Sequence, residues 1–414
     1  MIKGGSSTVI YEITQAVPVL VGRGAVGEMA ERLRTSGNCR RAVLVYDSGV
    51  EKAGISGKVK DALEARGICC ICYNKVERDA PDYSVDELSG LIRDNGCDVI
   101  VAVGGGSTLD TAKGAGLAAS NGGKIRDYML QRPARLSGGD TAAAFRQTKK
   151  YSQDIPLITI PTTSGTGSEI RLTGVIHDTE LHMKDIIEYT PYFAVQDPEL
   201  LTTMPPFITA TTAFDAMAHA NESMTSIIGQ KKLRNTILGA GVTQTVFEWL
   251  PTAVSEPENL EAREKLAVAS TLAALCSLDG LAHVGHNAAD SLNYNFDLAH
   301  GYACSLTLPP AIELAAPYAA ESVRHIALAQ GLSLSGKETP EELGRLVADA
   351  YRALAHRVGI PPIRERGITK EQLLQKKVID DIFLNQNAMN KFPSGKGITR
   401  EDAAWMLEQI YDAY

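Results

Sequence analysis

The first half of this chain alternates short β-branched, apolar runs with helical stretches, and this alternation constrains the fold more than any other feature. The runs that we expect to form strands are residues 42–46, 69–73, 99–103 and 156–160. Strands separated by helices pair in parallel, and those helices cover both faces of the resulting sheet. The sequence therefore predicts an α/β fold built on a parallel sheet with helices on both faces.

The pattern changes after Met204-Pro205-Pro206. From there to Tyr414 helical periodicity continues with few interruptions, and a proline pair is typical of the first turn of a long helix. A chain of 414 residues is long enough for two domains. We therefore expect an α/β domain over residues 1–206 and an all-α domain over residues 207–414. A polar stretch over residues 131–154 is expected to be a surface insertion or a lid.

Charge and hydropathy exclude several classes of partner. The chain has 41 Lys and Arg against 49 Asp and Glu, a net charge of −8, so it lacks the basic surface that nucleic acid or an anionic membrane requires. No apolar run approaches the length of about 20 residues that a membrane-spanning helix needs, and the N-terminus lacks the apolar core of a signal peptide. Seven cysteines without a pair of CxxC motifs predict buried free thiols rather than disulfides or a thiolate zinc site. We expect a soluble, cytoplasmic protein.

A glycine-rich turn follows the third expected strand and opens a helix over residues 108–113. The turn consists of Gly104, Gly105, Gly106 and Ser107. Glycines let a backbone approach a pyrophosphate closely, and the helix N-terminus offers free N–H groups and the positive end of the helix dipole. The turn therefore predicts a phosphate-binding cradle, with a plain tight turn as the alternative.

Two further features support a dinucleotide site. Residues 161–169 follow the fourth expected strand and are dense in hydroxyls and glycines, which suits contacts to ribose, base and phosphate at the carboxyl ends of parallel strands. Asp47 ends the first expected strand, where a carboxylate accepts hydrogen bonds from the adenosine ribose and repels a 2′-phosphate. Asp47 therefore favours NAD over NADP. Its alternative role is a helix N-cap.

A metal site is predicted in the second half. Asp215 and His219 are four residues apart, so on a helix their side chains leave the same face. Such a pair is also common on surfaces and in cores. Three of the eight histidines, His283, His286 and His300, fall within one short stretch. Imidazoles and a carboxylate suit a divalent cation such as Fe(II), Zn(II), Mn(II) or Co(II), with an open position for a substrate oxygen.

Together these motifs resemble the iron-containing (group III) alcohol dehydrogenases, which are metal-dependent. The resemblance rests on residues 104–107 with Asp110 and Lys113, residues 161–169, Asp215 with His219, and residues 286–300, 21–27 and 204–206. It implies a dehydroquinate synthase-like architecture, with NAD bound by residues 1–206, a divalent metal bound by residues 207–414, and the active site in the cleft between them. It also implies a homodimer or higher homo-oligomer that acts on a small-molecule alcohol or aldehyde.

The resemblance implies four metal ligands, which are Asp215, His219, His286 and His300. Lactaldehyde reductase-like members separate their third and fourth ligands by fourteen residues, and His286 and His300 have this spacing. His283 then either lines the cleft or packs as a helix histidine. The metal, Fe(II) first and Zn(II) or Mn(II) as alternatives, is expected to act as a Lewis acid in hydride transfer to or from NAD(H).

The resemblance also implies the cofactor contacts. They are Asp47, Gly104, Gly105, Gly106, Ser107, Asp110, Thr162, Thr163, Thr166, Thr173, Val175 and Lys184, the last three on the nicotinamide side. Many members carry a further histidine four residues after the third ligand, near the nicotinamide, where this chain has Asp290. We therefore expect Asp290 to relay a proton or to bond the nicotinamide ribose, with His283 taking part of the catalytic role.

The substrate is predicted less directly. Alternation along a strand places Arg171, Thr173 and Val175 on one face, and the family places the last two beside the substrate. Our hypothesis is that Arg171, aided by Lys184 or a basic residue of segment 131–154, binds an anionic tail, because guanidinium forms bidentate bonds to such groups. Sulfoacetaldehyde, phosphonoacetaldehyde and succinic semialdehyde carry such a tail. The alternative is an arginine paired with a local carboxylate.

Three other functions share parts of this pattern. Glycerol and polyol-phosphate dehydrogenases have the same architecture but usually lack the hydroxyl-rich form of residues 161–169. A dehydroquinate synthase-like lyase needs basic residues around its metal, and residues 211–222 and 280–301 contain no Lys or Arg. A non-catalytic protein of this fold is disfavoured because every metal and phosphate position is filled. The predicted function is therefore interconversion of a short-chain primary alcohol and its aldehyde.

Overall fold

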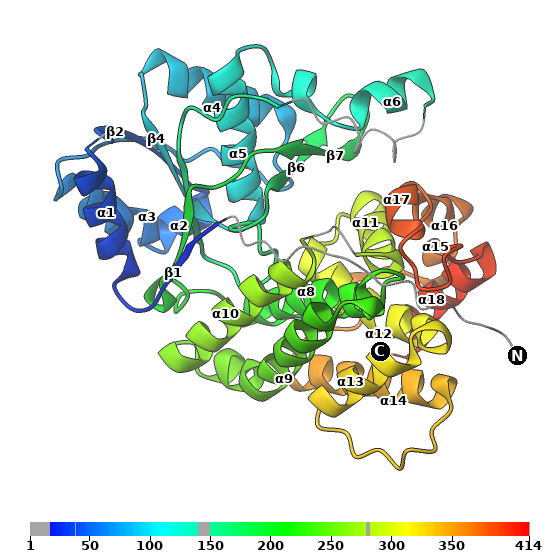
Figure 1. Ribbon diagram of the computed structural model, residues 1–414. Coiled ribbons are helices and arrows are strands. Elements are labelled where there is room, and N and C mark those ends of the chain that lie inside the picture. The colour runs from blue at the N-terminus through cyan, green and yellow to red at the C-terminus, as the bar shows by residue number, and fades with distance from the viewer. Residues whose placement is uncertain (1–16, 38, 140–149, 279–281, 414) are drawn as a thin grey trace, which may run out of the picture.

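The computed structural model describes residues 17–37, 39–139, 150–278 and 282–413 (Figure 1). The main sheet has six strands, and all neighbouring strands run parallel. In spatial order they are β1 Val19–Val21, β8 Phe193–Gln196, β5 Leu157–Pro161, β4 Val99–Gly104, β2 Arg41–Val45 and β3 Cys69–Tyr73. The last four lie within one residue of the predicted strands. The sequence does not predict β1 and β8, because runs of three and four residues are too short to show periodicity.

Helices cover both faces of this sheet (Figure 1). They are α1 Ala25–Ser36, α2 Ser48–Lys52, α3 Ile55–Glu64, α4 Asp82–Asp94 and α5 Gly106–Asn121. Val43 and Val45 of β2 pack with α4 and α5, whereas Ala42 and Leu44 pack with α1 and α3, because successive strand residues point to opposite faces. The predicted α/β architecture, with helices on both faces of a parallel sheet, is confirmed.

A separate antiparallel hairpin, β6 Thr173–Asp178 and β7 Met183–Glu188, follows β5 along the chain. In Figure 1 it lies between α5 and the helices of the second half. Helix α6, Arg132–Ser137, lies in the predicted insertion over residues 131–154. Residues 140–149 of that insertion lie outside the described residues, so its role as surface insertion or lid stays a prediction.

The segment before β6 forms a turn. The Arg171 N–H donates to the Ser168 carbonyl at 3.2 Å, and Gly167 has a left-handed φ of 61°. The strand begins only at Thr173. The expectation that Arg171, Thr173 and Val175 alternate along one strand is therefore wrong, because Arg171 follows the turn that its N–H closes and lies before β6.

The second half consists of helices in the described residues. They are α8 Pro206–Thr225, α9 Leu233–Ser255, α10 Leu260–Cys276, α11 Val284–Phe296, α12 His300–Ala315, α13 Ala320–Ala329, α14 Pro340–Arg357, α15 Lys370–Leu373, α16 Lys376–Asp381, α17 Gln386–Met389 and α18 Arg400–Asp412. Helix α8 begins at Pro206, where the fixed φ of proline suits a first helical residue. A domain boundary there stays a prediction. No helix within the described ranges is long and apolar enough to cross a membrane.

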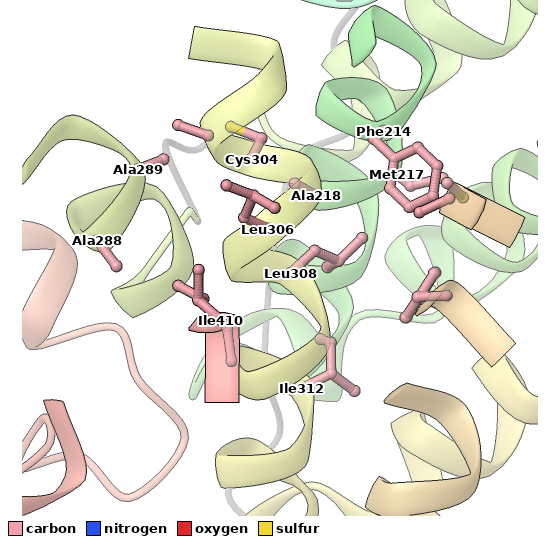
Figure 2. Packing of buried hydrophobic residues seen from close by; sticks show 14 of the residues in the cluster. Phe214, Met217, Ala218, Ala288, Ala289, Cys304, Leu306, Leu308, Ile312 and Ile410 are labelled. Carbon is pink, nitrogen blue, oxygen red and sulfur yellow. The ribbon is translucent and has the colours of Figure 1, made fainter. Parts of the chain in front are cut away.

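Helices α8, α11 and α12 pack against one another at the centre of the helical half. Figure 2 shows this packing around α12, with Phe214 and Met217 of α8, Ala289 of α11, and Leu308 and Ile312 of α12. These side chains are almost completely buried. The packing of these three helices therefore fixes the position of the N-terminal end of α12, where His300 is the first residue.

Candidate active site

The structure brings together the four predicted metal ligands. Asp215 and His219 lie on successive turns of α8, His286 lies on α11, and His300 is the first residue of α12. From Asp215 Oδ1 the distances are 3.5 Å to His219 Nε2, 3.7 Å to His300 Nε2 and 3.8 Å to His286 Nε2. Two segments about 70 residues apart in sequence therefore meet in one cluster, which we call the histidine cluster.

The histidine cluster has the properties of a metal site. Asp215 Oδ1 and His286 Nε2 are buried without a hydrogen-bond partner among the described residues, which is costly unless a ligand completes them. Two atoms that bind one metal at about 2.1 Å in tetrahedral geometry lie about 3.4 Å apart, close to the separations observed here. Burial, followed by the charge of Arg171, lowers the pKa of His219, so this imidazole is neutral and able to bind a metal. The side chains present therefore fit a divalent cation.

Glu222 hydrogen-bonds His286 of the histidine cluster, and the sequence did not predict this role. The carboxylate is fully buried, and its Oε1 accepts a hydrogen bond from His286 Nδ1 at 2.8 Å. A proton on Nδ1 leaves Nε2 with its lone pair toward Asp215, as in carboxylate–histidine–metal triads. A Cβ at Gly285 would lie 2.4 Å from Glu222 Oε1, so glycine there leaves room for the carboxylate. The available signal was a carboxylate one turn beyond His219, in a helix whose other acidic residue is Asp215.

His283 lies in the core and not at the histidine cluster. Its side chain is 0 % exposed, and Nε2 lies 3.0 Å from the Thr225 hydroxyl. Its backbone N–H donates to Glu222 Oε2 at 2.5 Å, and its ring packs edge-on against Phe392. Burial lowers the pKa of His283 to about 4, so the ring is neutral. Of the two sequence interpretations, this geometry is that of the packed histidine, and it gives no support to a catalytic role.

Cys304 is a second residue that sequence reasoning missed. It lies one turn after His300 on α12, and its Sγ is 3.5 Å from His300 Nε2. Its sulfur and one ligand atom each of Asp215, His286 and His300 all lie within 4.8 Å of one another. The sequence interpretation of the seven cysteines as buried free thiols did not single out this one.

Asp290 and Lys184 connect the hairpin to the helical half. Lys184 Nζ on β7 donates to Asp290 Oδ1 on α11 at 3.0 Å, and Asp290 Oδ1 lies 3.7 Å from His300 Nδ1. Burial opposes ionisation of Asp290, but the charges of Lys184 and His300 outweigh it and lower the pKa of Asp290. Lys184 also lines a pocket of about 760 Å³, together with Asp79 and Tyr294. An ionised carboxylate therefore lies between this pocket and the histidine cluster.

The two loops of the predicted dinucleotide site lie side by side at the carboxyl ends of β4 and β5. The Thr162 N–H donates to the Gly104 carbonyl at 3.0 Å. A Cβ at Gly106 would lie 2.8 Å from Thr166 Cγ2, so a side chain there would fill the space between the loops. Helix α5 begins at Gly106, with its free N–H groups toward the same space. The predicted residues that meet here are Gly104, Gly105, Gly106, Ser107, Thr162, Thr163 and Thr166.

Asp47 caps a helix. Its Oδ1 accepts hydrogen bonds from the backbone N–H groups of Gly49 at 2.7 Å and Val50 at 2.9 Å, at the start of α2. This is the geometry of the alternative that the sequence left open. The N-cap uses one carboxylate oxygen, so binding of the adenosine ribose by Asp47 stays a prediction.

Asp110 and Lys113 hold the second loop and the hairpin against α5. Ser168 Oγ–H donates to Asp110 Oδ1 at 2.6 Å. Lys113 Nζ donates to the Ser168 carbonyl, to Ser168 Oγ and to the Thr173 carbonyl, each at 2.7 Å. Burial lowers the pKa of Lys113 to about 8. Asp110 is thus hydrogen-bonded within the protein. Val175, another of the predicted cofactor contacts, lies on the hairpin and is 38 % exposed.

Arg171 lies near enough to the histidine cluster for its charge to affect His219, and it has no partner carboxylate among the described residues. Its Nε donates to the Thr166 carbonyl at 3.0 Å and its Nη2 donates to the Ser277 hydroxyl at 2.8 Å. No carboxylate of the described residues lies within ion-pair distance of it. Burial lowers the pKa of Arg171, and the charge of Asp215 is the largest effect that opposes this shift. The alternative of a local ion pair is therefore not what these contacts show.

Comparison with known proteins gives the family. Residues 17–198 match the family described as Iron-containing alcohol dehydrogenase, and residues 209–409 match the Fe-containing alcohol dehydrogenase family, C-terminal. A choline dehydrogenase from Bacillus subtilis is 32% identical over 389 residues, which are 91% of this chain and 92% of that protein. The chain therefore belongs to the iron-containing alcohol dehydrogenase family, a family of oxidoreductases.

Solved structures agree in fold. An alcohol dehydrogenase from Oenococcus oeni has a TM-score of 0.86 at 27% identity, covering 97% of this chain and 100% of that chain. A sulfoacetaldehyde reductase from Bifidobacterium kashiwanohense, in complex with NAD+, has a TM-score of 0.80 at 25% identity, covering 98% of this chain and 100% of that chain. The relatives thus include both alcohol dehydrogenases and aldehyde reductases.

Proposed function

We propose that this protein is an NAD(H)-dependent, divalent-metal alcohol dehydrogenase or aldehyde reductase that interconverts a short-chain primary alcohol and its aldehyde. The observation that carries this proposal is the position of Thr166 between the two half-sites. Its methyl group borders the space at Gly106, and its carbonyl accepts a hydrogen bond from Arg171. The charge of Arg171 in turn lowers the pKa of His219. One loop therefore borders both the nucleotide cradle and the histidine cluster.

The proposed ligands are Asp215, His219, His286 and His300. A bound divalent metal supplies Lewis acidity toward the substrate oxygen. NAD supplies the hydride acceptor or donor, and its binding is supported by the NAD+ complex of the similar sulfoacetaldehyde reductase. Asp215 contributes the negative charge of the site. The hydrogen bond from His286 Nδ1 to Glu222 fixes the orientation of the third ligand.

Asp290 is the proposed proton acceptor. It occupies the position of the histidine found in many members, and Lys184 keeps its carboxylate ionised at neutral pH. Its side chain is 27 % exposed, so a proton held on Oδ1 can pass to water in the neighbouring pocket. Lys184 thus serves as a positioning residue for Asp290.

For the substrate, we propose that Arg171 selects an aldehyde with an anionic tail. Nη1 has no protein partner among the described residues, so one edge of the guanidinium is available beside the histidine cluster. The name of the sulfoacetaldehyde reductase supports an anionic tail, whereas the name of the choline dehydrogenase points to a cationic alcohol, which a half-buried guanidinium repels.

Metal analysis combined with an NADH-oxidation assay tests the proposal. The panel contains propionaldehyde, sulfoacetaldehyde, phosphonoacetaldehyde and succinic semialdehyde, with NAD reduction by choline in the opposite direction. We expect kcat/KM to favour the anionic aldehydes, and Arg171→Ala to reduce that preference about 10- to 100-fold, the value of a charge-assisted hydrogen bond. Arg171→Lys, which keeps the charge, is the control and is expected to retain part of it.

Two results contradict different parts of the proposal. An unchanged preference in Arg171→Ala, or faster turnover of choline, overturns the role of Arg171. Protein that binds metal and NAD but oxidises NADH with no aldehyde overturns the reaction itself.

A further inference from the structure

A thiol that the proposed reaction does not use lies at the histidine cluster. Cys304 is fully buried, one turn into α12. Figure 2 shows it toward the N-terminal end of α12, and it belongs to the same buried apolar cluster as Ala218 of α8, Ala289 of α11 and Leu308 of α12. The thiol therefore has apolar side chains on one side and the histidine cluster as its polar neighbour.

Distances place the Cys304 sulfur among the ligand atoms. Sγ lies 3.5 Å from His300 Nε2, compared with 3.7 Å between Asp215 Oδ1 and the same nitrogen. At tetrahedral angles, two ligand atoms that share one cation are separated by about 3.4 Å when both bonds are near 2.1 Å, and by about 3.6 Å when one is a sulfur–metal bond near 2.3 Å. The thiol is therefore as close to His300 Nε2 as Asp215 is, and it lies within 4.8 Å of one ligand atom each of Asp215 and His286.

A second observation shows that the space beside the sulfur is suited to a cation. Asp215 Oδ1 and His286 Nε2 are buried and have no hydrogen-bond partner in the described part of the chain, and one ligand atom of each of these residues lies within 4.8 Å of Sγ. Cys276 provides a contrast within the same core. Its Sγ lies 3.6 Å from the backbone carbonyls of Ala220 and Asn235, the surroundings of a structural cysteine.

We propose that Cys304 is a sulfur ligand of this metal site, and that it biases the site toward Zn(II) and Co(II) over Mn(II). The inference rests on the proposed function only in requiring that the histidine cluster binds a divalent cation. Coordination replaces the S–H bond by a sulfur–metal bond and releases one proton to the buffer. Thiolate is a softer ligand than imidazole or carboxylate, so it favours zinc over the harder manganese ion.

Co(II) binding to the chelator-treated protein tests this without any turnover. Wild-type protein titrated with one equivalent of Co(II) is expected to show a sulfur-to-cobalt charge-transfer band in the near ultraviolet together with visible d–d bands. The charge-transfer band should be absent in Cys304→Ser and Cys304→Ala and present in Cys276→Ser. In competition titrations, the ratio of Mn(II) to Zn(II) dissociation constants should fall about tenfold or more in Cys304→Ala.

The outcomes separate this inference from the proposed function. Co(II) that binds with d–d bands but without a charge-transfer band in wild type overturns the sulfur ligand and leaves the proposed function standing. A charge-transfer band that persists in Cys304→Ser assigns the sulfur elsewhere, for example to exposed Cys69 or Cys72, and also overturns it. Failure of wild type to bind Co(II), Zn(II) or Mn(II) overturns both proposals. Because the decisive spectrum is that of wild type, the test does not depend on the folding of a variant.

Discussion

Glu222→Gln tests how the hydrogen bonds behind the histidine cluster control metal binding. Glu222 accepts two hydrogen bonds through separate oxygens, from His286 Nδ1 at 2.8 Å and from the His283 backbone N–H at 2.5 Å. Glutamine has one acceptor oxygen and one NH2 group, so it cannot accept both bonds. A backbone N–H is always a donor, whereas an imidazole can change tautomer. The amide oxygen is therefore expected to face His283 and the amide nitrogen to face His286.

This arrangement reverses the His286 tautomer. The amide N–H donates to Nδ1 and moves the ring proton to Nε2, the atom that lies 3.8 Å from Asp215 Oδ1. A protonated Nε2 has no lone pair for a metal. A mismatched buried hydrogen bond costs about 1–3 kcal/mol, and changes in such supporting residues reduce metal affinity about 10- to 100-fold. We expect a loss in this range for Glu222→Gln and a smaller one for Glu222→Ala, which leaves the tautomer free.

Zinc dissociation constants from competition with a chromophoric chelator measure the effect. Asn221→Ala is the matched control, because Asn221 is the neighbouring buried residue of α8 but donates to the Tyr351 hydroxyl, away from the histidines. It should lower the thermal midpoint of the metal-free protein and leave zinc affinity unchanged. Wild-type affinity in Glu222→Gln, or an equal loss in Asn221→Ala, would refute the tautomer argument.

Three further predictions concern the two half-sites and their connection. His286→Ala should lose metal and activity while keeping NADH binding, whereas His283→Ala should retain metal at reduced stability; the reverse behaviour would contradict the assignment of the third ligand. Gly106→Ala should weaken NADH binding about tenfold or more, because its Cβ lies 2.8 Å from Thr166 Cγ2, and zinc affinity should not change. Burial lowers the pKa of Lys113 to about 8, below the value of about 10.4 in an unfolded chain, so the unfolded state binds more protons between these values. From pH 8 to 10 the free energy of unfolding of wild type should therefore rise relative to that of Lys113→Met, and parallel curves from denaturant unfolding would falsify this assignment.

The sheet could be predicted because its central strands are continuous apolar runs. Ile100, Val101 and Ala102 of β4 are buried on both faces, so no solvent-facing position interrupts the pattern. β1 is an edge strand and β8 is the strand next to it. Both are short and pair only in the context of the rest of the sheet, so no local sequence pattern reveals them. The sequence predicted the loop over residues 161–169 but not that β6 begins only at Thr173, because the place where this loop ends depends on packing such as the close approach of Gly167 to Ala274 of α10, far along the chain.

For the site, sequence spacing located the histidine cluster but not Glu222 and Cys304, which contact it. Asp215 and His219 share a helix face at any packing, so the i,i+4 pair is visible without a structure. Glu222 and Cys304 act through neighbours on other helices, and their roles depend on how α8, α11 and α12 pack. Asp47 shows a different limit of sequence reasoning. A carboxylate at the end of a strand suits both ribose binding and a helix N-cap, and only the structure reveals the N-cap.

The contacts of the second loop imply that the two half-sites are energetically coupled. Thr166 borders the cradle at Gly106 and holds Arg171 through its carbonyl, while Lys113 fixes Ser168 of the same loop to α5. A nucleotide that orders this loop therefore also orders the guanidinium beside Asp215. Coupling between two ligands is reciprocal, so a substrate with an anionic tail that binds Arg171 must tighten NAD(H) binding by the same factor as NAD(H) tightens its own. Titrating NADH with and without an unreactive sulfonate measures one side of this equality, and titrating the sulfonate with and without NADH measures the other.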